Sequence, residues 1–319
     1  MSEPRRARLR ALAKINLDLR VLGRRPDGYH ELRTVFQTIS LADRIDVCFE
    51  KARTTRIELA GDLATPDNLI RKAAAAVLDS MRVSARVELR LKKGIPIGAG
   101  LGGGSSDAAA VLLALPVLAG THLDVSILMK LAAQLGSDVP FFLLGGTAVA
   151  MGRGTELYPV ADLGRRQGIL VASGLSISTA AAYAALGPCL TSESQENKIF
   201  SFQSQVWSYT AGTGGETGLR QGRNDFETVI FEQFPKLASI QRKLRRLGAL
   251  PARMTGSGSA VFGLFENRAE AIRALESIRE ERVFPISFVG RRQFRALWWR
   301  ALRAHAQENI WPPRSRYER

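Results

Sequence analysis

The sequence is poor in cysteine, the residue from which disulfide scaffolds and many zinc sites are built. Its 319 residues include two cysteines, Cys48 and Cys189, which lie far apart and without metal-ligand spacing. Dense disulfides are typical of small secreted proteins, whereas free thiols persist in reducing compartments. The cysteine content therefore excludes a disulfide framework and a cysteine-based zinc site, and it favours the cytoplasm.

Long hydrophobic runs are absent as well. A membrane helix needs about 20 consecutive apolar residues, and the longest candidate, residues 139–151, is too short and contains Gly145-Gly146. The first residues, Met-Ser-Glu-Pro-Arg-Arg, lack the apolar segment of a secretory signal. We expect no transmembrane helix and no stable membrane association.

Acidic residues are too few to balance the basic ones, since 30 Asp and Glu face 45 Lys and Arg and leave a net charge of +15. A basic surface attracts polyanions, which admits a nucleic-acid-binding protein as one hypothesis. The excess is concentrated at residues 5–25, at residues 242–246 and in the C-terminal tail. A compositional bias toward arginine explains it more simply, and the same field attracts nucleotides. We expect no nucleic-acid partner.

Apolar periodicity predicts a mixture of strands and helices. Strands are predicted at residues 9–22, 44–50, 55–60, 83–91, 139–150, 169–173 and 286–289, and residues 254–265 are predicted to contain a glycine-serine turn followed by a strand. Helices are predicted at residues 68–81, 106–115, 126–135, 226–247 and 268–279. Asp67 is a candidate cap of the first helix. Residues 191–223 are rich in Ser, Gln, Thr and Gly, which predicts a long surface loop.

The order of these elements lacks the regular strand–helix–strand alternation of a parallel α/β fold. It favours an α+β fold in two lobes. We place the lobes at residues 1–160 and 161–290, followed by a basic tail at residues 291–319. In the tail, apolar residues at i, i+3, i+4, i+7 and i+8 predict an amphipathic helix beginning at Phe294. We expect that helix to dock on the protein's own surface, with a dimer contact and an anionic membrane as alternatives. The sequence leaves a monomer and a homodimer open.

Glycine is concentrated in one loop that carries most of the chemical information. Residues 96–110 read Pro-Ile-Gly-Ala-Gly-Leu-Gly-Gly-Gly-Ser-Ser-Asp-Ala-Ala-Ala. Glycine lets backbone N–H groups approach an anion without a Cβ in the way, and the following helix adds unpaired N–H donors and the positive end of its dipole. The loop therefore predicts a phosphate site.

Three well-known phosphate loops fit this segment poorly. Its G-x-G-x-x-G spacing at Gly98, Gly100 and Gly103 lacks the acidic residue that a dinucleotide-binding fold places about 20 residues later. The protein-kinase motifs His-Arg-Asp and Asp-Phe-Gly are missing. A Walker loop requires Gly-Lys-Ser/Thr, whereas Gly104 is followed directly by Ser105.

The chain instead resembles the GHMP kinases in four segments that occur in the family's order. These are residues 13–17 (Ala-Lys-Ile-Asn-Leu) with 28–32 (Gly-Tyr-His-Glu-Leu), the glycine loop, residues 136–142 (Gly-Ser-Asp-Val-Pro-Phe-Phe) and residues 255–259 (Thr-Gly-Ser-Gly-Ser). The resemblance implies an N-terminal lobe like a ribosomal-protein α/β sandwich and a ferredoxin-like C-terminal lobe. It also implies an enzyme that transfers a phosphoryl group from ATP, with Mg²⁺, to a small-molecule alcohol.

The resemblance assigns roles to individual positions. Asp138 matches the catalytic aspartate that accepts the hydroxyl proton, and Lys14 matches the lysine beside it. The ATP loop comprises Pro96, Ile97, Gly98, Ala99, Gly100, Leu101, Gly102, Gly103, Gly104, Ser105 and Ser106. One of the two serines is expected to help hold Mg²⁺, although no acidic metal ligand is evident.

The acceptor implied by the resemblance is a methylerythritol tagged with cytidine diphosphate. Tyr29 and His30 match a pair that binds the cytosine, Tyr183 matches a second aromatic residue against the base, and Asn16 is expected at the methylerythritol end. An acceptor of the homoserine or mevalonate type is the alternative within the family. The Gly-Tyr-His segment argues against it, because these side chains suit a nucleobase.

Overall fold

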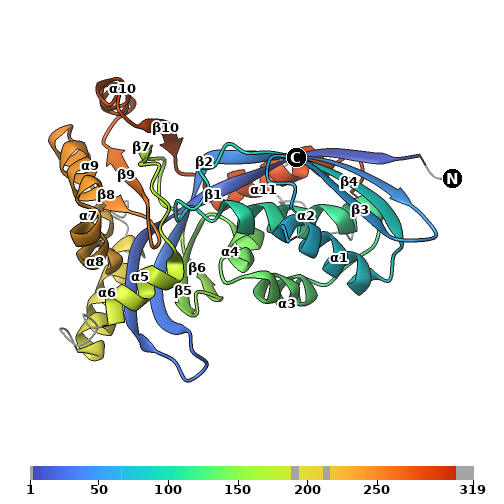
Figure 1. The fold of residues 1–319 in the computed structure, drawn as a ribbon, viewed down its shortest axis with the longest axis horizontal. Coiled ribbons are helices and arrows are strands. Elements are labelled where there is room, and N and C mark those ends of the chain that lie inside the picture. Colours follow the sequence, from blue (N-terminus) through green and yellow to red (C-terminus); the bar gives the residue numbers. More distant parts are fainter. Residues whose placement is uncertain (1–2, 66, 188–193, 211–215, 307–319) are drawn as a thin grey trace.

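The computed structural model describes residues 3–65, 67–187, 194–210 and 216–306. Cys189 and the last part of the predicted tail, residues 307–319, lie outside the described residues. The described chain forms two sheets, and these divide the molecule into two lobes (Figure 1). This is the α+β fold that the sequence predicts. No described helix has the length and apolar character needed to cross a bilayer.

The first sheet has the strand order β3-β4-β2-β5-β6, with β1 paired to β2. Its strands are β1 (Arg5–Arg24), β2 (His30–Lys51), β3 (Arg56–Gly61), β4 (Ala85–Lys92), β5 (Thr147–Gly152) and β6 (Glu156–Pro159). The helices α1 (Leu69–Met81), α2 (Gly103–Ala119), α3 (Val125–Leu135) and α4 (Val139–Leu144) lie together on one side of it (Figure 1). Helix α2 is apolar all round and buried along most of its length, as expected for a helix at the centre of a core.

The second sheet has the order β10-β7-β9-β8. Its strands are β7 (Gln167–Ala172), β8 (Ala252–Met254), β9 (Ala260–Phe265) and β10 (Arg282–Ser287). The helices of this half are α5 (Thr179–Leu186), α6 (Gln195–Thr210), α7 (Glu216–Gln221), α8 (Phe226–Gln233), α9 (Pro235–Arg246) and α10 (Arg268–Ser277). The interaction of helices with one antiparallel sheet is compatible with a ferredoxin-like lobe.

The hairpin of β1 and β2 links the two lobes. Residues 9–22 of β1 are almost continuously buried. The first part of this stretch, with Leu9 and Leu12, packs in the core of the first lobe together with α2. The last part, with Leu19 and Val21, packs in the core of the second lobe. A shared apolar cluster unites Ile15 and Val35 of this hairpin with Phe262 and Phe288 of the second half. Because apolar burial is the main source of folding free energy, this cluster fixes one lobe against the other.

Three sequence predictions of local structure were wrong. Residues 139–150 form the short helix α4 followed by β5. Pro140 lies in the first turn of α4, where the backbone N–H that proline lacks would have no partner within the helix. Within residues 191–223, the described parts form α6 and α7 rather than a loop. Helix α1 is capped by Asn68, whose side chain accepts a hydrogen bond from the Ile70 N–H, and not by Asp67.

The predicted tail helix is α11 (Arg291–Leu302), and it docks on the protein as expected. Phe294, Trp298 and Leu302 are buried in the core beneath the first sheet. Phe294 lies so close to Gly145 that a Cβ on that glycine would be 2.3 Å from the ring. Helix α11 therefore packs against the end of α4, the helix that begins immediately after Asp138.

We predict that Trp298→Ala lowers the free energy of unfolding by about 3–5 kcal/mol, because it removes a buried aromatic side chain and leaves a cavity. Arg300→Ala, on the exposed side of the same helix, is expected to change it by less than about 0.5 kcal/mol. Urea unfolding of both variants provides the measurement. Equal stability of the two would contradict the docked helix.

Candidate active site

The glycine loop runs from β4 to α2 and is held by close backbone contacts. Gly98, Gly100 and Gly102 all have φ between +66° and +76°, a conformation that other residues rarely adopt. A Cβ on Gly100 would lie 2.2 Å from the Thr255 carbonyl oxygen, and one on Gly102 would lie 2.8 Å from the Phe142 ring. These positions therefore require glycine for packing as well as for the turn.

Helix α2 begins at Gly103 and has no side-chain cap. Its first N–H groups are thus free to bind an anion, as the sequence predicts. The loop surrounds a cavity of about 340 Å³, which also includes Asn68 and Lys93. Ser106 does not face this cavity, because it is buried and its hydroxyl donates to the Leu12 carbonyl at 2.7 Å.

Lys14 and Asp138 come together as predicted. The Lys14 Nζ lies 3.6 Å from Asp138 Oδ2. The lysine side chain is 4% exposed and the aspartate 33%, so the charge that loses most of its water is the lysine and not the aspartate. Burial accordingly lowers the pKa of Lys14, although the charge of Asp138 and a hydrogen bond donated to its carboxylate act in the opposite direction.

Asn16 lies in the same buried network as Lys14. Its Oδ1 accepts hydrogen bonds from the Lys14 Nζ at 2.8 Å and from the Gly256 N–H at 2.9 Å, and its Nδ2 donates to the Thr34 hydroxyl at 2.8 Å. Its backbone N–H donates to the Thr255 hydroxyl at 3.0 Å. The sequence marked residues 255–259 only as part of the resemblance, and it provided no signal for Thr34.

A second cavity, of about 830 Å³, joins Asp138 to the three predicted aromatic residues. Its lining includes Tyr29, His30, Ser137, Asp138 and Tyr183. The rings of His30 and Tyr183 are stacked with their centroids 4.3 Å apart, and Tyr29 is half exposed. Burial and the neighbouring Arg24 lower the pKa of His30, which favours a neutral ring that can both donate and accept hydrogen bonds.

Ser105 lines both cavities. The loop cavity and the aromatic cavity therefore adjoin the same residue at the beginning of α2, and Asp138 lines the second of them. A phosphate held by the loop and an alcohol held in the second cavity would face each other at this junction, which is the geometry that group transfer requires.

A buried cluster beside the glycine loop was not identified from the sequence. The Lys93 ammonium pairs with Asp107 at 3.0 Å and with Asp43, whose other oxygen accepts from the Gly94 and Ile95 N–H groups. Burial, with the charge of Asp43, raises the pKa of Asp107 to about 7. Asp107 Oδ1 is buried and has no hydrogen-bond partner among the described residues. The cluster leaves an acidic side chain without full compensation in the lining of the loop cavity.

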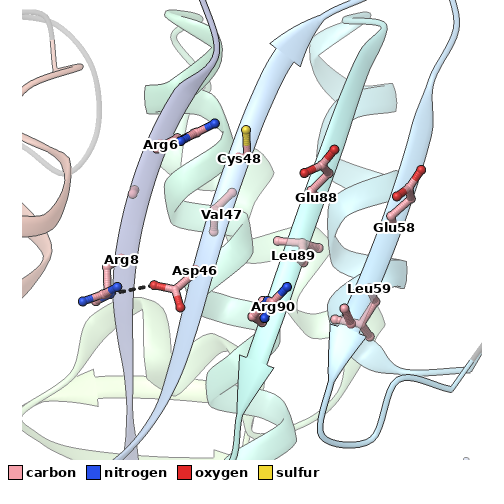
Figure 2. A pocket seen from close by; sticks show the side chains of 12 residues that line it. Arg6, Arg8, Asp46, Val47, Cys48, Glu58, Leu59, Glu88, Leu89 and Arg90 are labelled. Carbon is pink, nitrogen blue, oxygen red and sulfur yellow. Dashed lines mark hydrogen bonds and ion pairs between the residues drawn. The ribbon is translucent and has the colours of Figure 1, made fainter.

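The open face of the first sheet carries another depression, but it holds none of the predicted site residues (Figure 2). Alternate residues of β1, β2, β4 and β3 face outward there, and many of their charges pair, as between Arg8 and Asp46 at 2.7 Å and between Arg86 and Glu88 at 2.8 Å. This pattern is typical of a solvated sheet surface. We therefore place the active site at the loop and the aromatic cavity.

A two-lobed fold with a glycine loop before a buried helix, and a Lys–Asp pair beside it, defines a small-molecule kinase of the GHMP class. Family models agree: GHMP kinases N terminal domain matches residues 68–146, and GHMP kinases C terminal matches residues 215–282. The 4-diphosphocytidyl-2-C-methyl-D-erythritol kinase of Solibacter usitatus is 56% identical over 99% of both chains. The chain belongs to the GHMP kinase family and, within it, to the 4-diphosphocytidyl-2-C-methyl-D-erythritol kinases.

Other relatives agree with this assignment. The enzyme of that name from Pelotomaculum thermopropionicum is 43% identical, over 80% of this chain and 87% of its own. A crystal structure of 4-(cytidine 5'-diphospho)-2C-methyl-D-erythritol kinase has a TM-score of 0.74 at 38% identity, covering 89% of this chain and 99% of that one. Homoserine kinase from Cytophaga hutchinsonii has a TM-score of 0.68 at 16% identity, over 92% of this chain and 98% of that one, and shares the fold.

We predict that Asp107→Asn removes a pH dependence of stability. A carboxyl whose pKa is higher in the folded protein binds a proton that the unfolded chain has released, so the wild type loses stability as the pH rises from about 4 to about 7. The variant lacks this loss, so its free energy of unfolding, relative to that of the wild type, should increase by roughly 2–4 kcal/mol as the pH rises through this range. Calorimetry between pH 4 and 8, with the exposed Asp79→Asn as control, tests this. A difference that is constant with pH would contradict it.

Proposed function

We propose that this chain is the ATP-dependent kinase that phosphorylates the 2-hydroxyl of 4-CDP-2-C-methyl-D-erythritol, a step of the non-mevalonate route to isoprenoid precursors. The observation that carries the proposal is the junction of the two cavities at Ser105, beside the Lys14–Asp138 pair. The names of the relatives support the choice of acceptor.

The loop cavity takes the phosphates of ATP in this proposal. Free N–H groups at the beginning of α2 bind and orient the phosphoryl oxygens, and the close contacts of Gly100 and Gly102 hold these donors in place before the substrate arrives. A site that is already ordered loses no energy on reorganisation when charge develops.

Asp138 is the proposed base. Its carboxylate makes no capping hydrogen bond to α4 and is one third exposed, so it is accessible to an acceptor hydroxyl. The hydroxyl proton passes to a carboxylate oxygen as the hydroxyl oxygen forms its bond to the γ-phosphorus, and the bond to ADP breaks. The Lys14 ammonium stabilises the negative charge of the transferred group.

Asn16 orients Lys14 in this scheme. With its amide bonded to Lys14, Thr34 and Gly256, it holds the ammonium toward Asp138. The predicted contact of Asn16 with the methylerythritol remains a prediction.

Mg²⁺ accompanies ATP in the proposal, and the residues fit a weakly held ion. No group of three or more His, Cys, Asp or Glu in the described chain has a metal-binding arrangement. Mg²⁺ binds substrate phosphates with only one or two protein ligands, and Ser105 is the better-placed serine, because the Ser106 hydroxyl is bonded to Leu12. The ion would supply positive charge against the phosphates.

The aromatic cavity takes the cytidine diphosphate end of the acceptor. Tyr29 and Tyr183 offer ring faces to the cytosine, and neutral His30 offers a hydrogen bond to its edge. A cytoplasmic location and the monomer-or-homodimer state remain predictions.

We predict that Asp138→Asn lowers kcat by about 10²–10⁴-fold with little change in the KM for ATP, because the amide cannot accept the hydroxyl proton. A coupled assay of ADP release with 4-CDP-2-C-methyl-D-erythritol measures this. Asp124→Asn, which preserves the cap of α3, serves as the matched control. Near-normal turnover by Asp138→Asn would refute the base. ADP release with homoserine or mevalonate, and none with the cytidine compound, would refute the acceptor.

We further predict opposite effects on stability from two lysine variants. Lys14→Met should lower kcat/KM by at least about 10²-fold yet leave the Tm at pH 7 unchanged or higher, because burial disfavours the charged form of Lys14 and Asp138 retains contact with water. Lys93→Met should lower the Tm. Burial acts to lower the pKa of Lys93, but the contacts with Asp107 and Asp43 outweigh burial, so the pKa of Lys93 is raised. Differential scanning calorimetry of both variants tests the contrast, and a large loss of Tm in Lys14→Met would contradict it.

A further inference from the structure

Arg153 lies at the edge of the aromatic cavity, and no motif in the sequence marks it. It occupies the turn between β5 and β6, where the Gly154 N–H donates to the Met151 carbonyl at 2.9 Å. Strand β5 pairs with β2 in a register that sets Gly152 opposite Leu32. The turn therefore projects beside the residues that precede Leu32, which include Tyr29 and His30.

The Arg153 guanidinium stacks on the Tyr29 ring. Its Cζ lies 3.4 Å from the ring centroid, well within the range of a cation–π contact. Its Nε is buried and has no hydrogen-bond partner among the described residues. The Tyr29 ring is half exposed, and the described contacts leave Arg153 as the group that covers one of its faces.

The charge around the cavity is unevenly distributed. Arg24 and Arg153 both line it, and Asp138 is the one carboxylate among the described lining residues. A ligand with a base at one end, a diphosphate in the middle and an alcohol at the other end matches this arrangement. The base meets the aromatic residues, the diphosphate meets the guanidinium, and the alcohol meets Asp138.

We infer that Arg153 determines specificity for the acceptor: its guanidinium covers one face of Tyr29, leaving the other for the pyrimidine, and its charge favours the diphosphate. This inference rests on the proposed function and adds a residue to the acceptor site. Arg153 is not a group of the transfer step. It therefore governs acceptor affinity and leaves kcat and the KM for ATP unchanged.

The test is calorimetric titration of the full-length wild type, Arg153→Met and Arg153→Lys with two probes, CDP and cytidine. Methionine removes the charge and the planar group, whereas lysine keeps the charge alone. We expect Arg153→Met to weaken CDP binding about tenfold and cytidine binding about threefold. Arg153→Lys should match Arg153→Met for cytidine and lie closer to the wild type for CDP. Arg86→Met, which removes an arginine from the open sheet face, should bind both probes as the wild type does.

Kinetics with 4-CDP-2-C-methyl-D-erythritol separates this inference from the proposed function. The expected result for Arg153→Met is an acceptor KM raised about five- to tenfold, with kcat and the KM for ATP unchanged. Wild-type affinity of Arg153→Met for both probes overturns the role of Arg153 while leaving the kinase intact. A wild type that binds CDP without turning the acceptor over refutes the proposed function, and weaker CDP binding by Arg153→Met then still supports the role of Arg153. A wild type that fails to bind CDP overturns both.

Discussion

The candidate active site depends on the buried side-chain amide of Asn16. Its oxygen accepts from Lys14 on its own strand and from Gly256 in the turn between β8 and β9, and its nitrogen donates to Thr34 on β2. Three elements from both lobes thus converge on one group. A buried polar group is costly unless its hydrogen bonds are made, so the amide favours the arrangement in which the hairpin and the turn are both in place. The same bonds that join the lobes orient the lysine.

This network explains how a charged lysine is held in a place that disfavours it. The Lys14 side chain is almost fully buried, and the lowered pKa indicates that the folded protein disfavours the charge. A single carboxylate, one third exposed, and one amide oxygen oppose that cost. Active sites commonly retain such unfavourable arrangements because a preorganised charge is worth more to the transition state than to the fold. Lys93, with two carboxylates around it, shows the opposite balance a short distance away.

The sequence predicted those parts of the site whose residues are close in the chain. The glycine loop and the helix after it follow from local backbone chemistry, whereas Lys14 and Asn16 were identified from the family resemblance. The pairing of Lys14 with Asp138 came from the resemblance, because 124 residues of chain separate them and no local pattern links them. Helix α4 was missed because an apolar run of this length fits a buried strand and a short helix equally well. Helices α6 and α7 were missed for another reason.

The contact of α6 with the rest of the protein is partly polar. Arg20 of β1 is buried and bonds to Asp18 of the same strand and to Gln205 of α6, while Phe202 and Tyr209 of α6 are buried in the apolar cluster shared by the two lobes. A helix whose buried residues are both polar and apolar gives a weak hydrophobic pattern, and this helix was therefore not predicted. Part of the arginine-rich stretch that prompted the nucleic-acid hypothesis therefore forms ion pairs within the protein. Arg20 pairs with Asp18, and Arg25 pairs with Glu31. Net charge counted from composition overstates the field available to a polyanion, because charges neutralised inside the fold or across strands no longer act at a distance. The cationic groups that bear on the proposed recognition are those that line the aromatic cavity, Arg24 and Arg153.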